Sequence, residues 1–227
     1  DRSVSRGLGD VYKRQQLNTL YKRNPNKKII IGDFSLPEFE YLYNNKWEVT
    51  EKIDGTNMSY YWDGHNLEIH GKTKVTQIPD HLLNKMKQLV TKELMNEIFS
   101  AYIDPEGKEK LINVIIYGEG YGKKIQKGGN YIKDDVSFRV FDIYINGYWL
   151  DRSSIEDICS KMNLDTAPIL GIMTLKEAED LVKKTFKSTI AENKDYEAEG
   201  VVCKPIVPLY SKNGKRIIVK IKSVDYK

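Results

Sequence analysis

Residues 46–69, with the sequence KWEVTEKIDGTNMSYYWDGHNLEI, read as β-strands because they are rich in β-branched and aromatic residues. Within this stretch, MSYYW (58–62) and LEIH (67–70) flank Asp63-Gly64, a dipeptide typical of tight hairpin turns. The stretch therefore predicts strands that pair in antiparallel fashion.

Helices and further strands are expected after this stretch. Pro79 is followed by apolar residues at helical spacing as far as Tyr102, which predicts a helix. The remaining expected elements are strands at 114–117, 137–145, 199–204 and 216–222, a glycine-rich turn from Gly118, and helices at about 152–163 and 174–187. Strands joined by hairpins, with helices apart from them, predict an α+β fold with antiparallel sheets flanked by helices.

Composition excludes several classes of protein. The 227 residues are 40% hydrophobic and 30% charged, with 36 basic against 32 acidic residues, as in ordinary globular proteins. Two cysteines and three histidines show no ligand spacing, so neither a zinc site nor a disulfide framework is expected. No run of about 18 apolar residues predicts a membrane span. We expect a cytoplasmic protein.

Residues 1–15 share no pattern with the rest of the chain. A natural arm, an expression scar and a sequence-assembly artefact all remain open for them, and we expect them to have no function. One large domain is expected over residues 16–227.

Lysines near both ends of this domain are candidates for chemistry. Lys52 lies in EKIDGTN (51–57), and a lysine becomes a nucleophile only when its amine is neutral. Lys220 and Lys222 are two residues apart on a predicted strand and so share one face. Two such lysines suit a phosphate chain, although a solvated edge strand would show the same alternation.

Three motifs lie between these lysines. Glu119 follows an apolar strand and Glu199 precedes one, so either carboxylate could bind ribose hydroxyls or a divalent metal, or serve as a turn residue. Phe138, in the FRVFD motif, shares a strand face with Val140, whereas Phe141 takes the other face. Base stacking and ordinary core packing both remain open for Phe138.

The five motifs KxDGxN, GEG, FxxFD, EGVVxK and KxK occur in this order between Lys52 and Lys222. Together they resemble the covalent nucleotidyltransferases, which comprise ATP- and NAD-dependent ligases and mRNA-capping enzymes. The likeness is greatest to RNA ligases of the RNA ligase 2 type and their single-domain phage relatives, and it covers residues 46–225. It implies a nucleotidyltransferase domain of the ATP-grasp-like kind.

The resemblance implies a role for each lysine. Lys52 would attack the α-phosphate of ATP, release pyrophosphate and carry AMP. The AMP would pass to a 5′-phosphate end, which a 3′-hydroxyl then attacks. Lys220 and Lys222 would contact the phosphates, and their charge would favour the neutral amine of Lys52.

The other motif residues would bind ATP and Mg²⁺ or Mn²⁺. Glu199 would hold the metal, Glu119 would bind the ribose or help to place the metal, and Phe138 would stack on the adenine. Glu51 would lie near the adenine side of the pocket. Lys72 stands where the family usually has arginine, with Lys74 as the alternative if the alignment is shifted.

Asn57 indicates RNA as the substrate, because DNA ligases and capping enzymes usually have arginine at this position. The RNA would be a nicked duplex or single-stranded ends. A DNA ligase, a capping-type enzyme and an inactive nucleic-acid binding module are the alternatives. The OB-type domain of capping enzymes and the N-terminal domain of NAD-dependent ligases are not expected here. We expect a monomer. The likeness to phage relatives leaves open a phage-encoded protein that acts in a host cytoplasm.

The segment from Lys123 to Tyr131 combines Lys123, Lys124 and Lys127 with Tyr121 and Tyr131. Such a mixture of charge and aromatic rings suits a nucleic-acid backbone. A solvated basic loop is the equal alternative.

Overall fold

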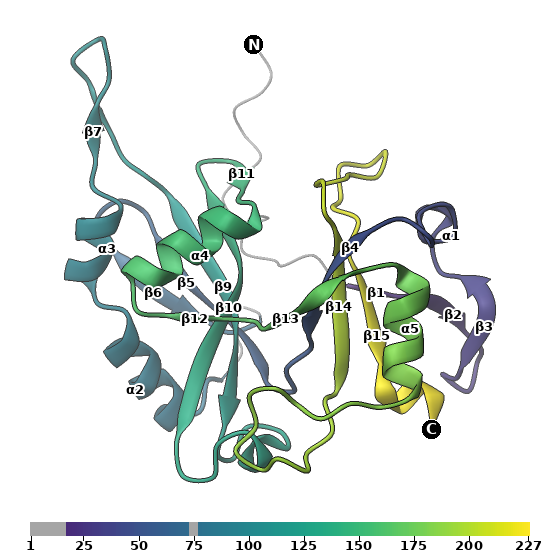
Figure 1. Cartoon of the computed structure of the whole chain (residues 1–227). Helices are drawn as coiled ribbons and strands as arrows, with labels where there is room; N and C mark the ends of the chain where they lie inside the picture. The colour runs from purple at the N-terminus through teal and green to yellow at the C-terminus, as the bar shows by residue number, and fades with distance from the viewer. Residues whose placement is uncertain (1–16, 73–76) are drawn as a thin grey trace. The chain divides into compact units, whose positions relative to one another are not determined.

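The computed structural model describes residues 17–72 and 77–227, so residues 1–15 and the alternative Lys74 lie outside the described residues. The chain divides into two compact units. Among the described residues, one contains Gly55–Ala167, and the other joins residues 17–54 with Pro168–Lys227 (Figure 1). The sequence predicted one domain and did not indicate this division, which falls two residues after Lys52.

The first unit is built on a six-stranded sheet in the order β11-β10-β9-β5-β6, with β12 beside β10. Its strands are β5 (Thr56–Trp62), β6 (Leu67–His70), β9 (Val114–Gly122), β10 (Val136–Ile145), β11 (Tyr148–Trp149) and β12 (Asp165–Thr166), and a separate hairpin pairs β7 (Tyr102–Ile103) with β8 (Glu109–Lys110). All neighbours are antiparallel except β12, which is parallel to β10. The predicted hairpin at Asp63-Gly64 is confirmed, because β5 and β6 flank it.

Helices cover one face of this sheet. They are α2 (Asp80–Leu89), α3 (Lys92–Ile98) and α4 (Arg152–Lys161), and a 3₁₀ turn, η1, spans Gly128–Asn130. Apolar side chains of the helices and the strands form one buried cluster. The single helix predicted after Pro79 is wrong, because Val90 is extended and the Thr91 side chain caps a second helix by accepting a bond from the Leu94 N–H.

Alternation along β9 separates the two faces of the sheet. Val114 and Ile116 belong to the helix-covered core, whereas Ile115 and Tyr117 pack with Tyr61 in a second cluster. The predicted turn at Gly118 is wrong, because the strand continues to Gly122. Glu119 therefore lies within a strand, on the face opposite the helices.

The second unit contains a five-stranded sheet in the order β1-β15-β14-β4-β13. Its strands are β1 (Asn18–Thr19), β4 (Trp47–Glu51), β13 (Ile169–Met173), β14 (Gly200–Pro205) and β15 (Val219–Lys222). Helix α5 (Leu175–Lys183) begins with a capping box between Thr174 and Glu177, and a 3₁₀ helix, η2, spans Ser223–Tyr226. Mixed helices and largely antiparallel sheets confirm the predicted α+β class.

Sequence patterns did not predict the elements before Lys46. Besides β1, these are β2 (Tyr21–Arg23), β3 (Ile29–Phe34) and α1 (Pro37–Tyr41). β1 pairs in parallel with β15, and β2 and β3 form a separate two-stranded sheet. β1 and β2, with two and three residues, are too short to show a period-2 pattern.

Glu179 is a buried carboxylate that ties several parts of this unit together. It accepts hydrogen bonds from the hydroxyls of Tyr21 at 3.0 Å, Tyr43 at 2.6 Å and Tyr226 at 3.2 Å, and pairs with Lys183 at 2.8 Å. Burial alone raises the pKa of Glu179, but the bonds from Lys183, Tyr43 and Tyr21 outweigh it and lower the pKa. Burial and Glu179 raise the pKa of Tyr21 to about 12.

Glu179→Gln should lower the free energy of unfolding by about 2–3 kcal/mol at neutral pH, because it removes a buried charge that four groups donate to. Since the carboxyl pKa is lowered on folding, this contribution is present above the ordinary pKa of 4.5 and is lost as the pH falls below it. Urea unfolding at several pH values should therefore show the variant approaching the parent in acid. Asp180→Asn, exposed on the same helix, should change stability by under about 0.5 kcal/mol. A constant difference at all pH values would contradict the assignment.

The two cysteines, Cys159 and Cys203, are buried free thiols. Burial raises the pKa of both thiols. In the described part of the chain, no helix combines the length and apolar character needed to cross a membrane.

Candidate active site

Lys52 directly follows β4 in the second unit. Its backbone N–H donates to the carbonyl of Gly200 at 2.9 Å, so the chain is still tied to β14 at this point. Its side chain is 20% exposed, and its amine donates to Oε2 of Glu199. The amine is therefore sheltered, positioned by a carboxylate and still accessible.

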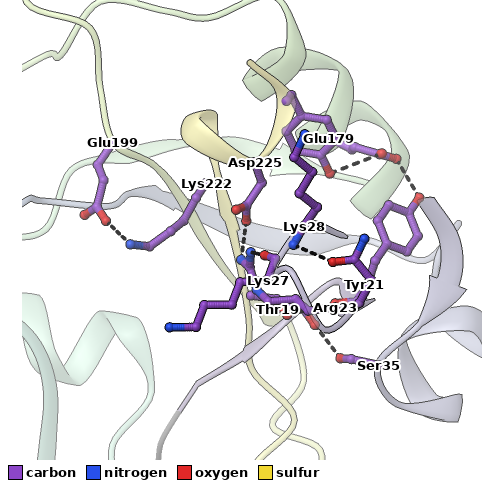
Figure 2. A network of polar contacts seen from close by, with 12 residues as sticks. Thr19, Tyr21, Arg23, Lys27, Lys28, Ser35, Glu179, Glu199, Lys222 and Asp225 are labelled. Carbon is purple, nitrogen blue, oxygen red and sulfur yellow. Dashed lines mark hydrogen bonds and ion pairs between the residues drawn. The ribbon is translucent and has the colours of Figure 1, made fainter. Parts of the chain in front are cut away.

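Glu199 lies between two lysines. Its Oε1 atom pairs with Nζ of Lys222 at 2.6 Å, while Oε2 accepts from Lys52 (Figure 2 shows the Lys222 pair). Gly200 stands opposite Lys222 in the ladder, with φ at 147°, and a Cβ there would lie 2.0 Å from the carbonyl oxygen of Ile221. The motif thus needs glycine after Glu199 to let β14 approach β15 closely.

Lys220 and Lys222 alternate with buried apolar residues on β15, so the predicted shared face is confirmed. Burial, followed by the charges of Lys222 and Lys52, lowers the pKa of Lys220, although Glu199 opposes this shift. The second unit therefore gathers Lys52, Lys220 and Lys222 around one carboxylate, an arrangement suited to an anion with several charges.

Glu51 is buried at the end of β4. One carboxylate oxygen accepts from the Ser188 hydroxyl, and the other accepts from the backbone N–H and hydroxyl of Thr189 at 2.8 Å and 2.6 Å. Glu51 thus anchors the segment around Thr189 next to the nucleophile. No local pattern predicts these partners, which lie 137 and 138 residues away.

In the first unit, Asn57 on β5 and Glu119 on β9 are direct cross-strand partners. They share the sheet face opposite the helices, because their neighbours Met58 and Gly118 face the core. Nδ2 of Asn57 is buried and has no hydrogen-bond partner among residues 17–72 and 77–227. An unsatisfied amide donor beside a carboxylate fits a bound polar ligand.

Lys72 follows β6 and is exposed. Within residues 17–72 and 77–227, no contact of the Lys72 side chain supports or opposes the role that the motif pattern implies.

The stacking role expected for Phe138 is wrong in this geometry. Its ring is 1% exposed and packs edge-on against Tyr60, with centroids 5.2 Å apart, in the helix-covered core. A Cβ at Gly118 would lie 2.3 Å from this ring, so the glycine leaves room for it. Phe141 is half-buried in the cluster on the opposite face, the face of Asn57 and Glu119.

Neither Tyr121 nor Tyr131 presents an accessible ring for base stacking beside the basic loop. Both are buried, and they pack edge-on against each other with centroids 5.6 Å apart. Lys123, Lys124 and Lys127 are exposed. The loop therefore offers cations without accessible aromatic rings.

The predicted residues thus fall into two sets, one in each unit. Lys52, Glu199, Lys220 and Lys222 meet in the second unit, and Asn57 and Glu119 meet in the first. Phe141 was overlooked, although the alternation of the FRVFD motif already put it on the face opposite Phe138.

Solved structures with the same fold include the RNA ligase of Naegleria gruberi. A mutant of that protein with AMP and Mn is 18% identical, with a TM-score of 0.63, over 95% of this chain and 57% of that chain. The same ligase with PPi is 21% identical, with a TM-score of 0.59, over 94% of this chain and 62% of that chain. This chain therefore spans about three-fifths of the length of these structures, and the likeness shows a shared fold.

The family model described as RNA ligase matches residues 45–222, which include all five motifs and both sets of site residues. The chain therefore belongs to the RNA ligase family.

Proposed function

We propose that this protein is an ATP-dependent RNA ligase that joins 3′-hydroxyl and 5′-phosphate ends through AMP carried on Lys52. One observation carries the proposal: the sheltered amine of Lys52 shares a carboxylate with Lys222, beside Lys220. This set provides a nucleophile together with cations for the phosphates it attacks.

In the first step, Nζ of Lys52 loses a proton and attacks the α-phosphorus of ATP. A P–N bond forms, the bond from the α-phosphorus to the bridging oxygen breaks, and pyrophosphate leaves. Lys220 and Lys222 stabilise the charge that develops on the phosphates.

In the second step, an oxygen of an RNA 5′-phosphate attacks the AMP phosphorus, the P–N bond breaks and Lys52 regains its proton. In the third step, the 3′-hydroxyl attacks the activated 5′-phosphate, loses its proton and releases AMP. Positioning supplies most of the rate in such transfers.

A divalent cation, Mg²⁺ or Mn²⁺, would bind the carboxylate of Glu199 in place of one of its two lysine partners, since hard cations prefer oxygen ligands. Glu119, in the first unit, is a separate candidate for binding ribose hydroxyls or a metal. The ion would supply charge neutralisation on the phosphates. Solved structures of the Naegleria ligase with ATP or AMP and Mn support this choice of nucleotide and metal.

We assign nucleotide binding in the first unit to Asn57 and Glu119, with Lys72 as a phosphate or sugar contact. Phe141 takes over the stacking role first expected of Phe138, because it lies on the same sheet face as Asn57. Glu51 has an indirect role, because its carboxylate holds the segment around Thr189 in place.

Phe141→Ala should raise the KM for ATP in lysyl-AMP formation by about tenfold, because one stacked base contributes roughly 1–3 kcal/mol. Phe138→Ala should instead lower the free energy of unfolding by about 3–5 kcal/mol, because it empties a core site. The ATP dependence of single-turnover lysyl-AMP formation and the urea unfolding of both variants check this assignment. A normal KM in the stable Phe141 variant would contradict it.

RNA is the proposed polymer because the family match and Asn57 both favour it. Nicked duplexes that differ only in an RNA or DNA 3′-hydroxyl strand test this choice, with ATP and GTP supplied separately. Sealing of the RNA nick with ATP is expected. Labelling by GTP alone would favour a capping-type enzyme, and preferential sealing of the DNA nick would favour a DNA ligase.

A further inference from the structure

The turn between β2 and β3 is held rigidly. Lys27 N–H donates to the Asn24 carbonyl and Asn24 N–H donates to the Lys28 carbonyl, both at 2.9 Å. The Asn24 side chain accepts from the Lys28 N–H at 3.0 Å, and Pro25 fixes one backbone dihedral. The side chains at the end of this hairpin therefore project from an ordered turn.

Lys27 occupies a backbone conformation that favours glycine or asparagine. Its φ is 62°, in the left-handed region, where a lysine is strained. A lysine held in this strained backbone conformation indicates a role for its side chain.

Four cations belong to this hairpin: Lys22, Arg23, Lys27 and Lys28. Lys22 pairs with Asp33 at 2.7 Å, and Arg23 pairs with Asp225 at 2.6 Å. Lys27 and Lys28 are exposed and have no carboxylate partner within residues 17–72 and 77–227. These two amines are available for an external anion.

The hairpin is continuous with the lysine set of the candidate active site. Thr19 lies opposite Lys220 in the β1–β15 ladder, and Asp225, the partner of Arg23, comes three residues after Lys222 (Figure 2). Arg23 also donates to the Lys27 carbonyl at 2.6 Å, which links the turn to this ion pair. Burial and the charges of Lys222 and Lys52 are the main causes of the lowered pKa of Lys220, and the charge of Arg23 adds to them.

We infer that the β2–β3 hairpin binds the RNA backbone, with Lys27 and Lys28 contacting phosphates of the strand whose 5′-phosphate end receives AMP from Lys52. The inference rests on the proposed function, which brings a polyanion to this unit. Two unpaired cations on a rigid turn suit phosphates, whose contacts supply most non-specific affinity for nucleic acid. Nucleic acid is preferred to an anionic membrane because the hairpin adjoins the site that must receive RNA.

The test compares Lys27→Gly/Lys28→Gln with the parent protein and with Lys108→Gln/Lys110→Gln. Glycine relieves the strain at position 27, so the hairpin variant should fold at least as stably. The control removes the same charge from the β7–β8 hairpin, where Lys108 and Lys110 pair with Glu106 and Asp104 at 3.0 Å and 3.4 Å. All three proteins are assayed for lysyl-AMP formation, binding of RNA at several salt concentrations, and sealing.

The hairpin variant should form lysyl-AMP at the parental rate but bind RNA about tenfold more weakly at low salt. The slope of log K against log salt should decrease by about 1.4–1.8, the expectation for two lost phosphate contacts. Sealing at limiting RNA should fall in parallel, and the control should match the parent.

An unchanged salt slope in a protein that forms lysyl-AMP would overturn the inference while leaving the proposed function intact. An equal loss in the control, or loss of binding to phosphatidylserine vesicles with RNA binding unchanged, would also overturn it. Absence of lysyl-AMP in the parent would instead contradict the proposed function.

Discussion

Lys52→Ala should reduce covalent transfer of AMP from ATP by at least about 10³-fold, the scale of loss when a nucleophile is removed. The amine of Lys52 is the atom that forms the P–N bond, and alanine has no replacement for it. Folding should be retained, because the side chain is partly exposed and Glu199 keeps its ion pair with Lys222. Labelling with α-³²P-ATP, followed by denaturing gel electrophoresis, measures the transfer.

Lys46→Ala provides the matched control for this experiment. Lys46 immediately precedes β4, the strand that Lys52 follows, and it pairs only loosely with Glu177 at 3.7 Å, with 55% of its side chain exposed. Its removal should leave labelling within about twofold of the parent. If the Lys52 variant were still labelled, a residue other than Lys52 would be the nucleophile.

Glu199→Gln should slow lysyl-AMP formation by about 10²–10³-fold, the range for loss of one group that organises the charges around a reacting centre, because Glu199 positions Lys52 and Lys222. The amide has the shape of the carboxylate but cannot neutralise Lys52 and Lys222 or bind a hard cation equally well. The variant should therefore also need more Mg²⁺ for half-maximal activity. Single-turnover labelling across a Mg²⁺ titration measures both effects.

Glu197→Gln controls for charge near the same strand. Glu197 lies two residues earlier and pairs on the surface with Lys227 at 2.6 Å. It should react within about twofold of the parent. If both variants react alike, the ion pairs of Glu199 have no role in the transfer.

Local patterns predicted the parts of the site that lie on single strands. Alternation on β15 correctly placed Lys220 and Lys222 on one face, and the Asp63-Gly64 signal correctly located a hairpin. Both features depend only on neighbouring residues, so a single sequence is enough to reveal them.

Features that depend on long-range register were not predictable. The pairing of Lys52 with Glu199 joins residues 147 positions apart, and periodicity carries no information about it. Helix periodicity likewise continues through Val90, where the structure ends one helix and Thr91 caps the next. A residue's face can be inferred from alternation, but which face a helix covers depends on tertiary packing, and Phe138 was misassigned for that reason.

The mass of the peptide that contains Lys52, measured after incubation of the protein with ATP and Mg²⁺, shows whether this residue carries AMP. We expect this peptide to gain the mass of one AMP, and we expect the gain to disappear in Lys52→Ala. AMP on a peptide containing Lys220 or Lys222, or no gain in mass on any peptide, would contradict this expectation.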